Sequence, residues 1–273
     1  MKTVVYLAGG VGNNFFQICL GEHLKSLGCS VVYNRYFIKH NIVTRTLGWS
    51  IHDDVILSHV LENESVENTI SLAAWCYLIR RFVLAKFFGK ERLLSYEESR
   101  FKGPKKYYFG YWQKGIHLND DTFALLSRKI SSFVDKWSVG KKVKKCSHLV
   151  HVRHGDFPES ERLTSTNFYR DVFKILGLSS ATLIAAPGTE LDNQRVFGAN
   201  VSISYDRGGS ALDDFVSLYY AKLIIVSNST YCYWAANLGL AETIVYPSML
   251  GRGRVWDLNW SKNKNTRMCS VFW

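Results

Sequence analysis

The residues best suited to chemistry lie in Leu149–Phe157, which begins as an apolar strand and ends in a polar turn. Alternation along a strand places His151 and Arg153 on one face and the intervening valines on the other. Ligands of open parallel sheets bind beyond the carboxyl ends of strands, so this strand delivers positive charge to the usual ligand site. A guanidinium there suits a diphosphate, because its planar fork donates two parallel hydrogen bonds. A surface Arg153 paired with Asp156 is the alternative.

A glycine-rich turn near the N-terminus is a second candidate. Gly9–Gly12 follows an apolar strand at Thr3–Ala8 and precedes an expected helix at Asn13–Leu27. Glycines let backbone amides approach a ligand, and a helix N-terminus favours an anion. The spacing differs from a dinucleotide fingerprint, and no acidic residue closes the next strand to hold a ribose. We select Gly12 and Asn13, at the junction of loop and helix, as binding candidates.

A third polar cluster separates an apolar strand, Leu223–Val226, from an expected helix, Tyr231–Leu238. Three hydroxyl groups and an amide there can cap the helix and leave backbone amides facing a phosphate. Capping alone explains one of the four side chains. The four binding candidates are Ser227, Asn228, Ser229 and Thr230.

These three segments, spread over most of the chain, resemble the α-1,2-fucosyltransferases. Leu149–Phe157 is similar to the family's His-x-Arg-Arg-Gly-Asp signature, with His154 in place of the second arginine. Gly9–Gln17 resembles its Gly-Gly-x-Gly-Asn-Gln-x-Phe-Gln opening, with Asn14 in place of the first glutamine. Ser227–Ala236 is similar to its Ser-Asn-Ser-Thr-Phe-Ser-Trp-Trp-Ala-Ala segment.

The resemblance implies an inverting glycosyltransferase that moves L-fucose from GDP-β-L-fucose to a galactose hydroxyl, forming an α-1,2 linkage. The partners are then GDP-fucose and a galactose-containing oligosaccharide, free or lipid-linked. A role in bacterial surface polysaccharide (O-antigen) synthesis follows from the same resemblance. His151 and Arg153 then belong to the donor site.

Charge develops on the diphosphate when the donor's bond from C1 to oxygen breaks, and Arg153 with the amides of Ser229 and Thr230 is placed to stabilise it. Asp156 is the expected base for the acceptor hydroxyl, although Arg153 beside it should lower its pKa. The substitutes are Glu159 and Glu161.

Two adjacent carboxylates, Asp213 and Asp214, open an expected helix at Ala211–Ala221. The resemblance places an aspartate near this position, and Asp214 is the closer match. A carboxylate suits guanine because it accepts hydrogen bonds from both N1–H and the N2 amino group. The alternative is a charge that interacts with the helix macrodipole.

An aromatic segment, Tyr107–Gln113, is expected to form a strand, and its Gly-Tyr-Trp-Gln end is similar to another segment of the family. Aromatic faces with a terminal amide suit a sugar, because the ring stacks and the amide binds hydroxyl groups. An aromatic core strand is an equally good interpretation.

The predicted fold is α/β and GT-B-like, with two Rossmann-like domains and a cleft between them. After the expected strand at Leu149–Val152, helices and strands alternate regularly, which indicates a parallel sheet covered on both faces. The Lys-rich connector Val139–Cys146 suggests an N-terminal α/β domain at 1–145, on the acceptor side, and a donor-binding domain at 146–273. The further expected elements are helices at Asn167–Leu176, Ala211–Ala221 and Tyr231–Leu238, and strands at Thr182–Ala186, Leu223–Val226 and Thr243–Tyr246.

Composition narrows the classes of function. The 273 residues are 47% hydrophobic with four prolines, which is the composition of a folded globular protein, and the net charge of +11 calls for an anionic partner. Six cysteines without a C-x-x-C pair predict neither a zinc site nor a disulfide framework. No paired carboxylates and no His/Cys cluster lie near the motifs, so no metal is expected, and no cofactor besides the donor substrate. Basic residues interrupt the apolar segment Leu72–Phe88, which predicts a helix with a basic edge rather than a membrane span.

The sequence therefore predicts a cytoplasmic enzyme, with the option of peripheral contact with an anionic membrane. A basic nucleic-acid-binding protein that uses the lysines of the connector is one alternative, and another nucleotide-dependent Rossmann enzyme is the second. The missing fingerprint disfavours the second, and the fucosyltransferase resemblance disfavours nucleic acid as a partner.

Overall fold

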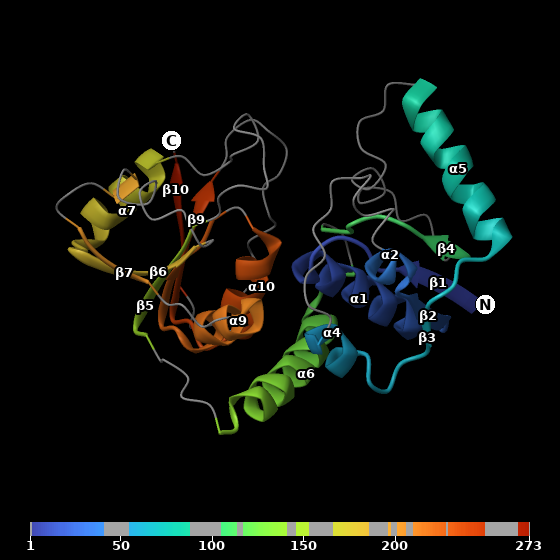
Figure 1. Cartoon of the computed structure of the whole chain (residues 1–273), viewed down its shortest axis with the longest axis horizontal. Coiled ribbons are helices and arrows are strands. Elements are labelled where there is room, and N and C mark those ends of the chain that lie inside the picture. Colours follow the sequence, from blue (N-terminus) through green and yellow to red (C-terminus); the bar gives the residue numbers. More distant parts are fainter. Residues whose placement is uncertain are drawn as a thin grey trace. The chain divides into compact units, whose positions relative to one another are not determined.

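The computed structural model of the chain describes residues 2–40, 55–87, 105–113, 117–140, 146–152, 166–185, 196–197, 201–205, 210–227, 229–248 and 267–272. The chain forms two compact units, Met1–Phe133 and Val134–Trp273. Each unit is built on one parallel β-sheet with helices (Figure 1). The α/β fold predicted from the sequence is confirmed. The domain boundary predicted after residue 145 stays a prediction, because residues 141–145 lie outside the described part.

The N-terminal unit has a four-stranded sheet in the order β3-β2-β1-β4, with every described pair parallel. Its elements are β1 (Lys2–Tyr6), α1 (Val11–Ser26), β2 (Ser30–Asn34), α2 (Tyr36–Lys39), α4 (Val55–Val60), β3 (Val66–Glu67), α5 (Leu72–Phe87) and β4 (Tyr107–Tyr108). Helix α6 (Asp120–Ser138) runs from this unit into the next. The glycine-rich turn therefore connects the central strand β1 to α1.

Alternation along β1 divides the apolar residues between two layers. Val4 and Tyr6 face a core that α2 and α5 complete with Phe37 and Ala74. The Tyr6 ring stacks on Phe109 with ring centroids 4.0 Å apart. Helix α1 packs on β1 and β2 through its own buried face. The sheet is thus covered on both faces, as a parallel sheet requires.

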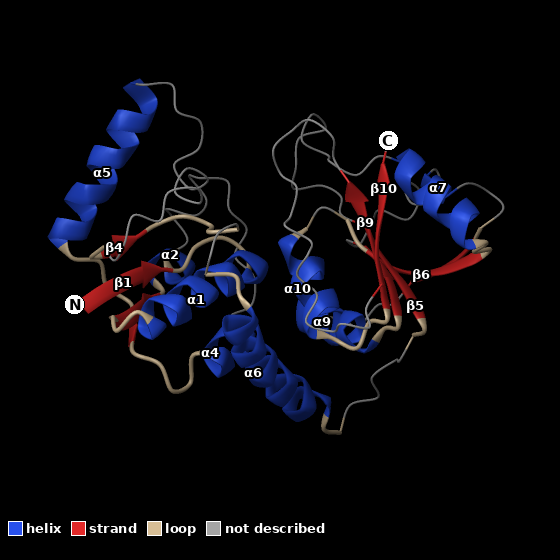
Figure 2. Ribbon diagram, turned by 180° about the vertical axis from the view of Figure 1, so that it is seen from behind, coloured by secondary structure: helices blue, strands red, loops and turns tan. Residues whose placement is uncertain are grey.

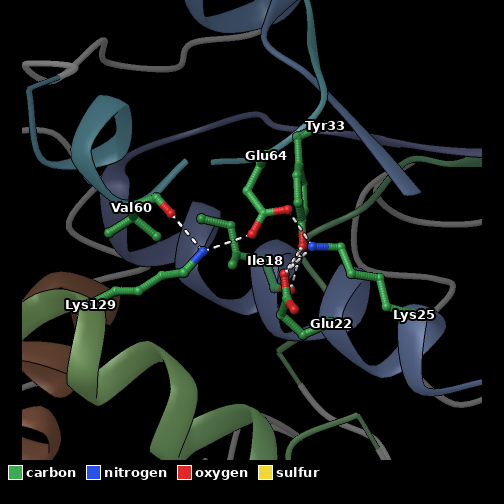
Figure 3. A network of polar contacts seen from close by, with 7 residues as sticks. All are labelled: Ile18, Glu22, Lys25, Tyr33, Val60, Glu64 and Lys129. Atoms are coloured by element: carbon green, nitrogen blue, oxygen red, sulfur yellow. Dashed lines mark hydrogen bonds and ion pairs between the residues drawn. The ribbon is translucent and has the colours of Figure 1, made fainter. Parts of the chain in front are cut away.

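A polar network anchors the C-terminal half of α1 (Figure 3). The Lys25 ammonium pairs with Glu22 at 2.8 Å and with Glu64, and Lys129 of α6 lies 2.8 Å from the other oxygen of Glu64. Burial alone would raise the pKa of Glu64, but the hydrogen bonds from Lys129 and Lys25 outweigh it and lower that pKa. Glu64 is therefore a shared anion that joins α1 to α6.

The same network includes a buried tyrosine of β2. The Tyr33 hydroxyl donates to Glu22 Oε1 at 2.8 Å and lies 3.2 Å from the Ile18 carbonyl oxygen. Burial and the negative charge of Glu22 raise the Tyr33 pKa well above its usual value, so the hydroxyl stays a donor. Lys129 also donates to the Val60 carbonyl at 2.9 Å. These contacts hold helix α1 at a set position on the sheet.

The C-terminal unit has a six-stranded sheet in the order β10-β9-β8-β5-β6-β7, again with parallel pairs. Its elements are β5 (His148–Val152), α7 (Thr166–Leu176), β6 (Ser180–Ala185), β7 (Ser202–Tyr205), α9 (Ala211–Tyr220), β8 (Leu223–Ile225), α10 (Thr230–Leu238), β9 (Thr243–Ser248) and β10 (Arg267–Phe272). Helix α7 lies on one face of the sheet, and α9 and α10 lie on the other (Figure 2).

The alternation predicted for the C-terminal half is confirmed, with element limits shifted by one or two residues. Strands β7 and β10 were not predicted, and β3 lies in a polar stretch, Glu62–Asn68, that was expected to be a loop. All three are edge strands, which carry weaker local signals because only one neighbouring strand constrains their side chains. These omissions leave the central strands unaffected.

We expect the Glu64 network to make stability depend on pH. The folded pKa of Glu64 lies below its ordinary value of 4.5, so its stabilisation is present above that value and is lost as pH falls through the folded pKa. Glu64→Gln should cost about 1.5–3 kcal/mol at pH 7 and much less near pH 3. Urea unfolding of both proteins across this range measures the difference.

A matched control for this variant is Glu242→Gln, which breaks the exposed pair with Lys222. Its effect should be near zero at both pH values, because exposed ion pairs contribute little. Equal effects of the two substitutions would contradict a special role for Glu64.

Candidate functional site

In each sheet, a strand from later in the chain pairs with a central strand from earlier in the chain. This arrangement creates a topological switch point. The chain runs outward from β1 to β2 and β3, and β4 then pairs with the other side of β1. In the C-terminal unit it runs from β5 to β6 and β7, and β8 pairs with the other side of β5. Ligands of open α/β sheets bind beyond the carboxyl ends of such strand pairs. A candidate binding residue is therefore expected to lie near the β1–β4 or the β5–β8 switch point.

The β5–β8 switch point brings together two residues predicted from separate motifs. His151, near the end of β5, has its Nδ1 atom 2.7 Å from the Ser227 hydroxyl, which lies two residues beyond β8. Both side chains are buried. Val150 and Val152 instead belong to the core on the α7 face, so the alternation predicted for this strand is confirmed.

The turn between β8 and α10 is held by its own backbone and by Cys232. The Ser229 amide donates to the Ser227 carbonyl at 2.8 Å, and Cys232 Sγ donates to the carbonyls of Ser227 and Ser229. The Ser229 amide is thus engaged within the turn, which corrects the expectation that it is available to a phosphate. The first-turn amides of a helix have no intrahelical acceptor, so Thr230 and Tyr231 present the donors here.

The two adjacent aspartates of α9 have different surroundings. Asp213 accepts from the Ser210 hydroxyl at 2.7 Å and from Trp137 Nε1 at 3.0 Å, and its amide donates back to Ser210. Asp213 is therefore part of the helix N-cap. For this residue the structural interpretation is correct, which leaves Asp214 as the functional candidate.

Tyr231 lies close to His151 at the switch point, and sequence reasoning did not select it. Its ring lies 6.2 Å from the His151 ring and 5.6 Å from Phe215, and its hydroxyl donates to the Ala211 carbonyl. Burial, followed by the negative charge of Asp214, raises the Tyr231 pKa well above its usual value. The residue is therefore a neutral aromatic group whose ring lies close to His151 and Phe215. Its position directly after Thr230 in the third motif was the available signal.

In the N-terminal unit, a buried glutamine joins the loops that follow β1 and β4. The Ala8 amide donates to Gln17 Oε1 at 3.0 Å, and Gln17 Nε2 donates to the carbonyls of Gly110 at 2.7 Å and Ala8 at 3.3 Å. One side chain thus satisfies three backbone groups at the switch point. The first motif and the aromatic segment, 93 residues apart, are parts of one structure.

The exposed side of this junction carries side-chain amides. Gln113 Nε2 donates to Asn13 Oδ1 at 2.8 Å. A Cβ atom at Gly9, which has a φ of 78°, would lie 2.8 Å from Asn13 Nδ2 and 2.9 Å from the Tyr111 ring. A glycine is therefore needed where the loop, the amide and the aromatic ring meet. Gly12 lies buried in the first turn of α1.

The aromatic segment is a short strand followed by a shaped turn, not the continuous strand that was predicted. Strand β4 covers Tyr107–Tyr108, after which Gly110 and Trp112 have φ values of 146° and 52° that end the ladder. His117 Nε2 donates to the Trp112 carbonyl at 2.7 Å. Burial lowers the pKa of His117 to about 4, so the ring is neutral near pH 7.

Several predicted site residues lie outside the described part of the chain: Arg153, His154, Asp156, Glu159, Glu161 and Asn228. Among the residues that the structure describes, no three His, Cys, Asp or Glu side chains cluster as metal ligands would. In the same residues, no helix combines the length and the apolar character needed to cross a bilayer.

Solved structures provide the comparison. The chain is similar to the NodZ α-1,6-fucosyltransferase soaked with GDP-fucose, with a TM-score of 0.50 and 15% identity over 93% of this chain and 97% of that one. It is also similar to the NodZ fucosyltransferase from Bradyrhizobium, with a TM-score of 0.51 and 14% identity over 93% and 96%.

The fold is that of a GT-B glycosyltransferase. The GT-B-like class predicted from the sequence is confirmed by this similarity and by the two parallel sheets. No protein-family model matches the sequence, and no curated protein matches it either. The similarity covers 93% of this chain and therefore includes residues of both units.

We expect substitutions of Gln17 and Gln113 to differ in their effect on the free energy of unfolding. Gln17→Leu should cost about 1–3 kcal/mol for each backbone group left unpaired, because water cannot replace a fully buried amide. Gln113→Leu should cost less than about 1 kcal/mol, since its half-buried partner Asn13 remains within reach of water. Urea unfolding monitored by circular dichroism compares them. Equal losses would show that Gln113 also serves the fold.

Proposed function

We propose that the chain is an inverting fucosyltransferase that uses GDP-β-L-fucose as donor. The observation that supports this most is the position of the motifs. His151, Ser227 and the start of α10 meet at the β5–β8 switch point of a GT-B fold. The similar NodZ structure was soaked with GDP-fucose, and the same motifs resemble those of the α-1,2-fucosyltransferases.

The donor diphosphate would lie at the β5–β8 switch point. Arg153 follows β5 directly, and its guanidinium would hold two diphosphate oxygens as negative charge develops on them. The first-turn amides of Thr230 and Tyr231 would donate to the same group. His151, oriented by Ser227, and the polar side chain of Asn228 complete the proposed phosphate site.

The guanine base would be read by Asp214. Its carboxylate can accept from N1–H and from the N2 amino group, and adenine offers no such pair of donors. Tyr231, neutral and with its ring 6.2 Å from that of His151, would supply an aromatic surface to the nucleotide. Asp213 has no part in this, because the N-cap and Trp137 already use its oxygens.

The acceptor would bind in the N-terminal unit. Asn13, Gln113 and Tyr111 present amides and an aromatic ring around Gly9, which suits a pyranose. Gly12 would help to position the turn. We propose galactose of a glycan as the acceptor and an α-1,2 linkage, as the sequence resemblance implies. Synthesis of bacterial O-antigen, at the cytoplasmic side of the membrane, is the corresponding role.

The acceptor hydroxyl requires a base, and Asp156 is the proposed one. Glu159 and Glu161 remain the substitutes, because a carboxylate beside Arg153 is a weaker proton acceptor. We expect no divalent metal to be required. Activity that survives EDTA would support this, whereas loss restored by Mn²⁺ or Mg²⁺ would contradict it.

One binding experiment tests the proposed function against its rivals. Calorimetric titration with GDP, GTP, NAD and an oligonucleotide should show a clear preference for the guanine nucleotides. NAD binding would favour another Rossmann enzyme, and oligonucleotide binding that collapses with salt would favour a nucleic-acid-binding protein. Release of GDP from GDP-fucose in the presence of a galactoside, followed by linkage analysis of the product, then tests the transfer itself.

We expect the two aspartates of α9 to differ in nucleotide binding. Asp214→Asn should weaken GDP binding by at least roughly tenfold and reduce the preference over ADP, because a charged acceptor for two guanine donors is lost. Asp213→Asn is the matched control and should bind GDP like the wild type. The measurement is the Kd for GDP and ADP in each variant. Unchanged GDP affinity in Asp214→Asn would contradict the proposed base recognition.

We also expect Arg153→Lys to be nearly as damaging as Arg153→Ala. The substitution keeps the charge but loses the two-pronged geometry, and the loss of one such donor costs on the order of 10²–10³ in turnover. Steady-state rates at saturating GDP-fucose measure the effect, with circular dichroism to confirm folding. A lysine variant within roughly threefold of wild type would show that Arg153 does not clamp the phosphates.

A further inference from the structure

Helix α5 exposes an apolar stripe on its surface. The stripe consists of Leu72, Cys76, Ile79 and Val83, whose spacings of four, three and four residues place them on one face of a helix. Leu72 is 80% exposed, Ile79 56% and Val83 43%, and Cys76 is exposed as well. Burying such side chains is favourable, so a continuous exposed row of them indicates a binding surface.

The opposite face of α5 accounts for the folding of the helix. Ala74 is fully buried in the core of the N-terminal unit, and Tyr77 and Leu78 pack against the same core. The Tyr77 ring stacks on Phe109 with centroids 5.9 Å apart. Figures 1 and 2 show α5 on the other side of the sheet from α1. The helix therefore packs on the unit through one face, and the apolar stripe lies outside these core contacts.

The charge of α5 indicates what covers the stripe. The 16 residues of the helix include Arg80, Arg81 and Lys86 and no acidic residue. Arg80 is exposed and follows Ile79 of the stripe directly in the sequence. A second copy of α5 would bring identical cationic helices together, which is unfavourable. An anionic surface complements this charge, as it does the net charge of +11.

A second helix with exposed apolar residues lacks these features. Helix α7 exposes Ile175 and Leu176, but these are neighbours in sequence and do not form a row along the helix. Asp171 is also exposed on α7. The combination of an apolar row with only basic charges thus distinguishes α5 from α7, which makes α7 a suitable internal control.

We propose that α5 is the element by which the chain binds an anionic lipid surface. The stripe lies in the interface between headgroups and acyl chains, and Arg80 contacts lipid phosphates. The helix lies along the membrane rather than across it, because three basic residues divide it. This surface is independent of the donor reaction, and it provides contact with a lipid-linked acceptor only if such an acceptor is used.

The test is co-sedimentation of the full chain with vesicles. Wild type should bind vesicles containing phosphatidylglycerol, bind phosphatidylcholine vesicles much more weakly, and release from the former as salt is raised. Ile79→Glu should lower the partition coefficient by at least roughly tenfold, and Arg80→Ser by roughly fivefold. The matched controls, Ile175→Glu and Lys174→Ser on α7, should bind like wild type.

Each variant replaces an exposed side chain, so the thermal unfolding midpoint should stay close to that of wild type. Binding by Ile79→Glu equal to that of Ile175→Glu would overturn the proposal, as would equal wild-type binding to neutral and anionic vesicles. Sedimentation velocity gives the remaining outcome. A wild-type dimer that Ile79→Glu dissociates would assign the stripe to a contact between copies and would also overturn the proposal. GDP binding is expected to be unchanged in all four variants, which separates this result from the test of the proposed function.

Discussion

The parallel pairing of β5 with β8 is the interaction on which the candidate site depends. The strands are neighbours in the sheet but are separated in the chain by α7, β6, β7 and α9. Their pairing sets His151 against Ser227, 76 residues away, and directs α10 from the same edge. The pairing of β1 with β4 does the same for the glycine-rich turn and the aromatic segment. In both units, the polar motifs come together because a strand from later in the chain, β4 or β8, pairs with the central strand β1 or β5.

Buried polar side chains give these loops their shape. Gln17 binds three backbone groups, the Asn14 amide donates to the carbonyls of Gly9 and Gly10, and neutral His117 holds the turn at Trp112. A buried backbone group without a partner is costly, so each contact strongly restricts the loop conformation. The half-buried side chains of Asn13 and Gln113, which bond to each other beside these loops, are then held in place for recognition.

Residues of the same type have different surroundings in this chain, and we assign them different roles. Asp213 bonds to the Ser210 cap and to Trp137, while its neighbour Asp214 is the residue proposed to bind the nucleotide. Glu64 is a shared partner of two lysines from α1 and α6, whereas α5 carries basic residues with no acidic residue in the same helix. The distribution of charge is therefore more informative about binding partners than the net charge. Some lysines are neutralised by carboxylates within the fold, and a helix with basic residues alone is the surface proposed for an anionic partner.

The sequence by itself determined the fold class and the order of the central elements. Regular alternation of apolar strands and helices predicted a parallel α/β architecture, and period-two alternation placed His151 apart from Val150 and Val152, because local periodicity decides which face a side chain occupies. The edge strands β3, β7 and β10 escaped prediction, since an edge strand pairs on one side only and its local signals are weak. Only the tertiary structure decided that Gln17 bridges to Gly110, that Asp213 bonds to the Ser210 cap of α9, and that Tyr231 lies beside His151. These relations depend on strand order and on contacts between distant segments, which no local pattern in the chain contains.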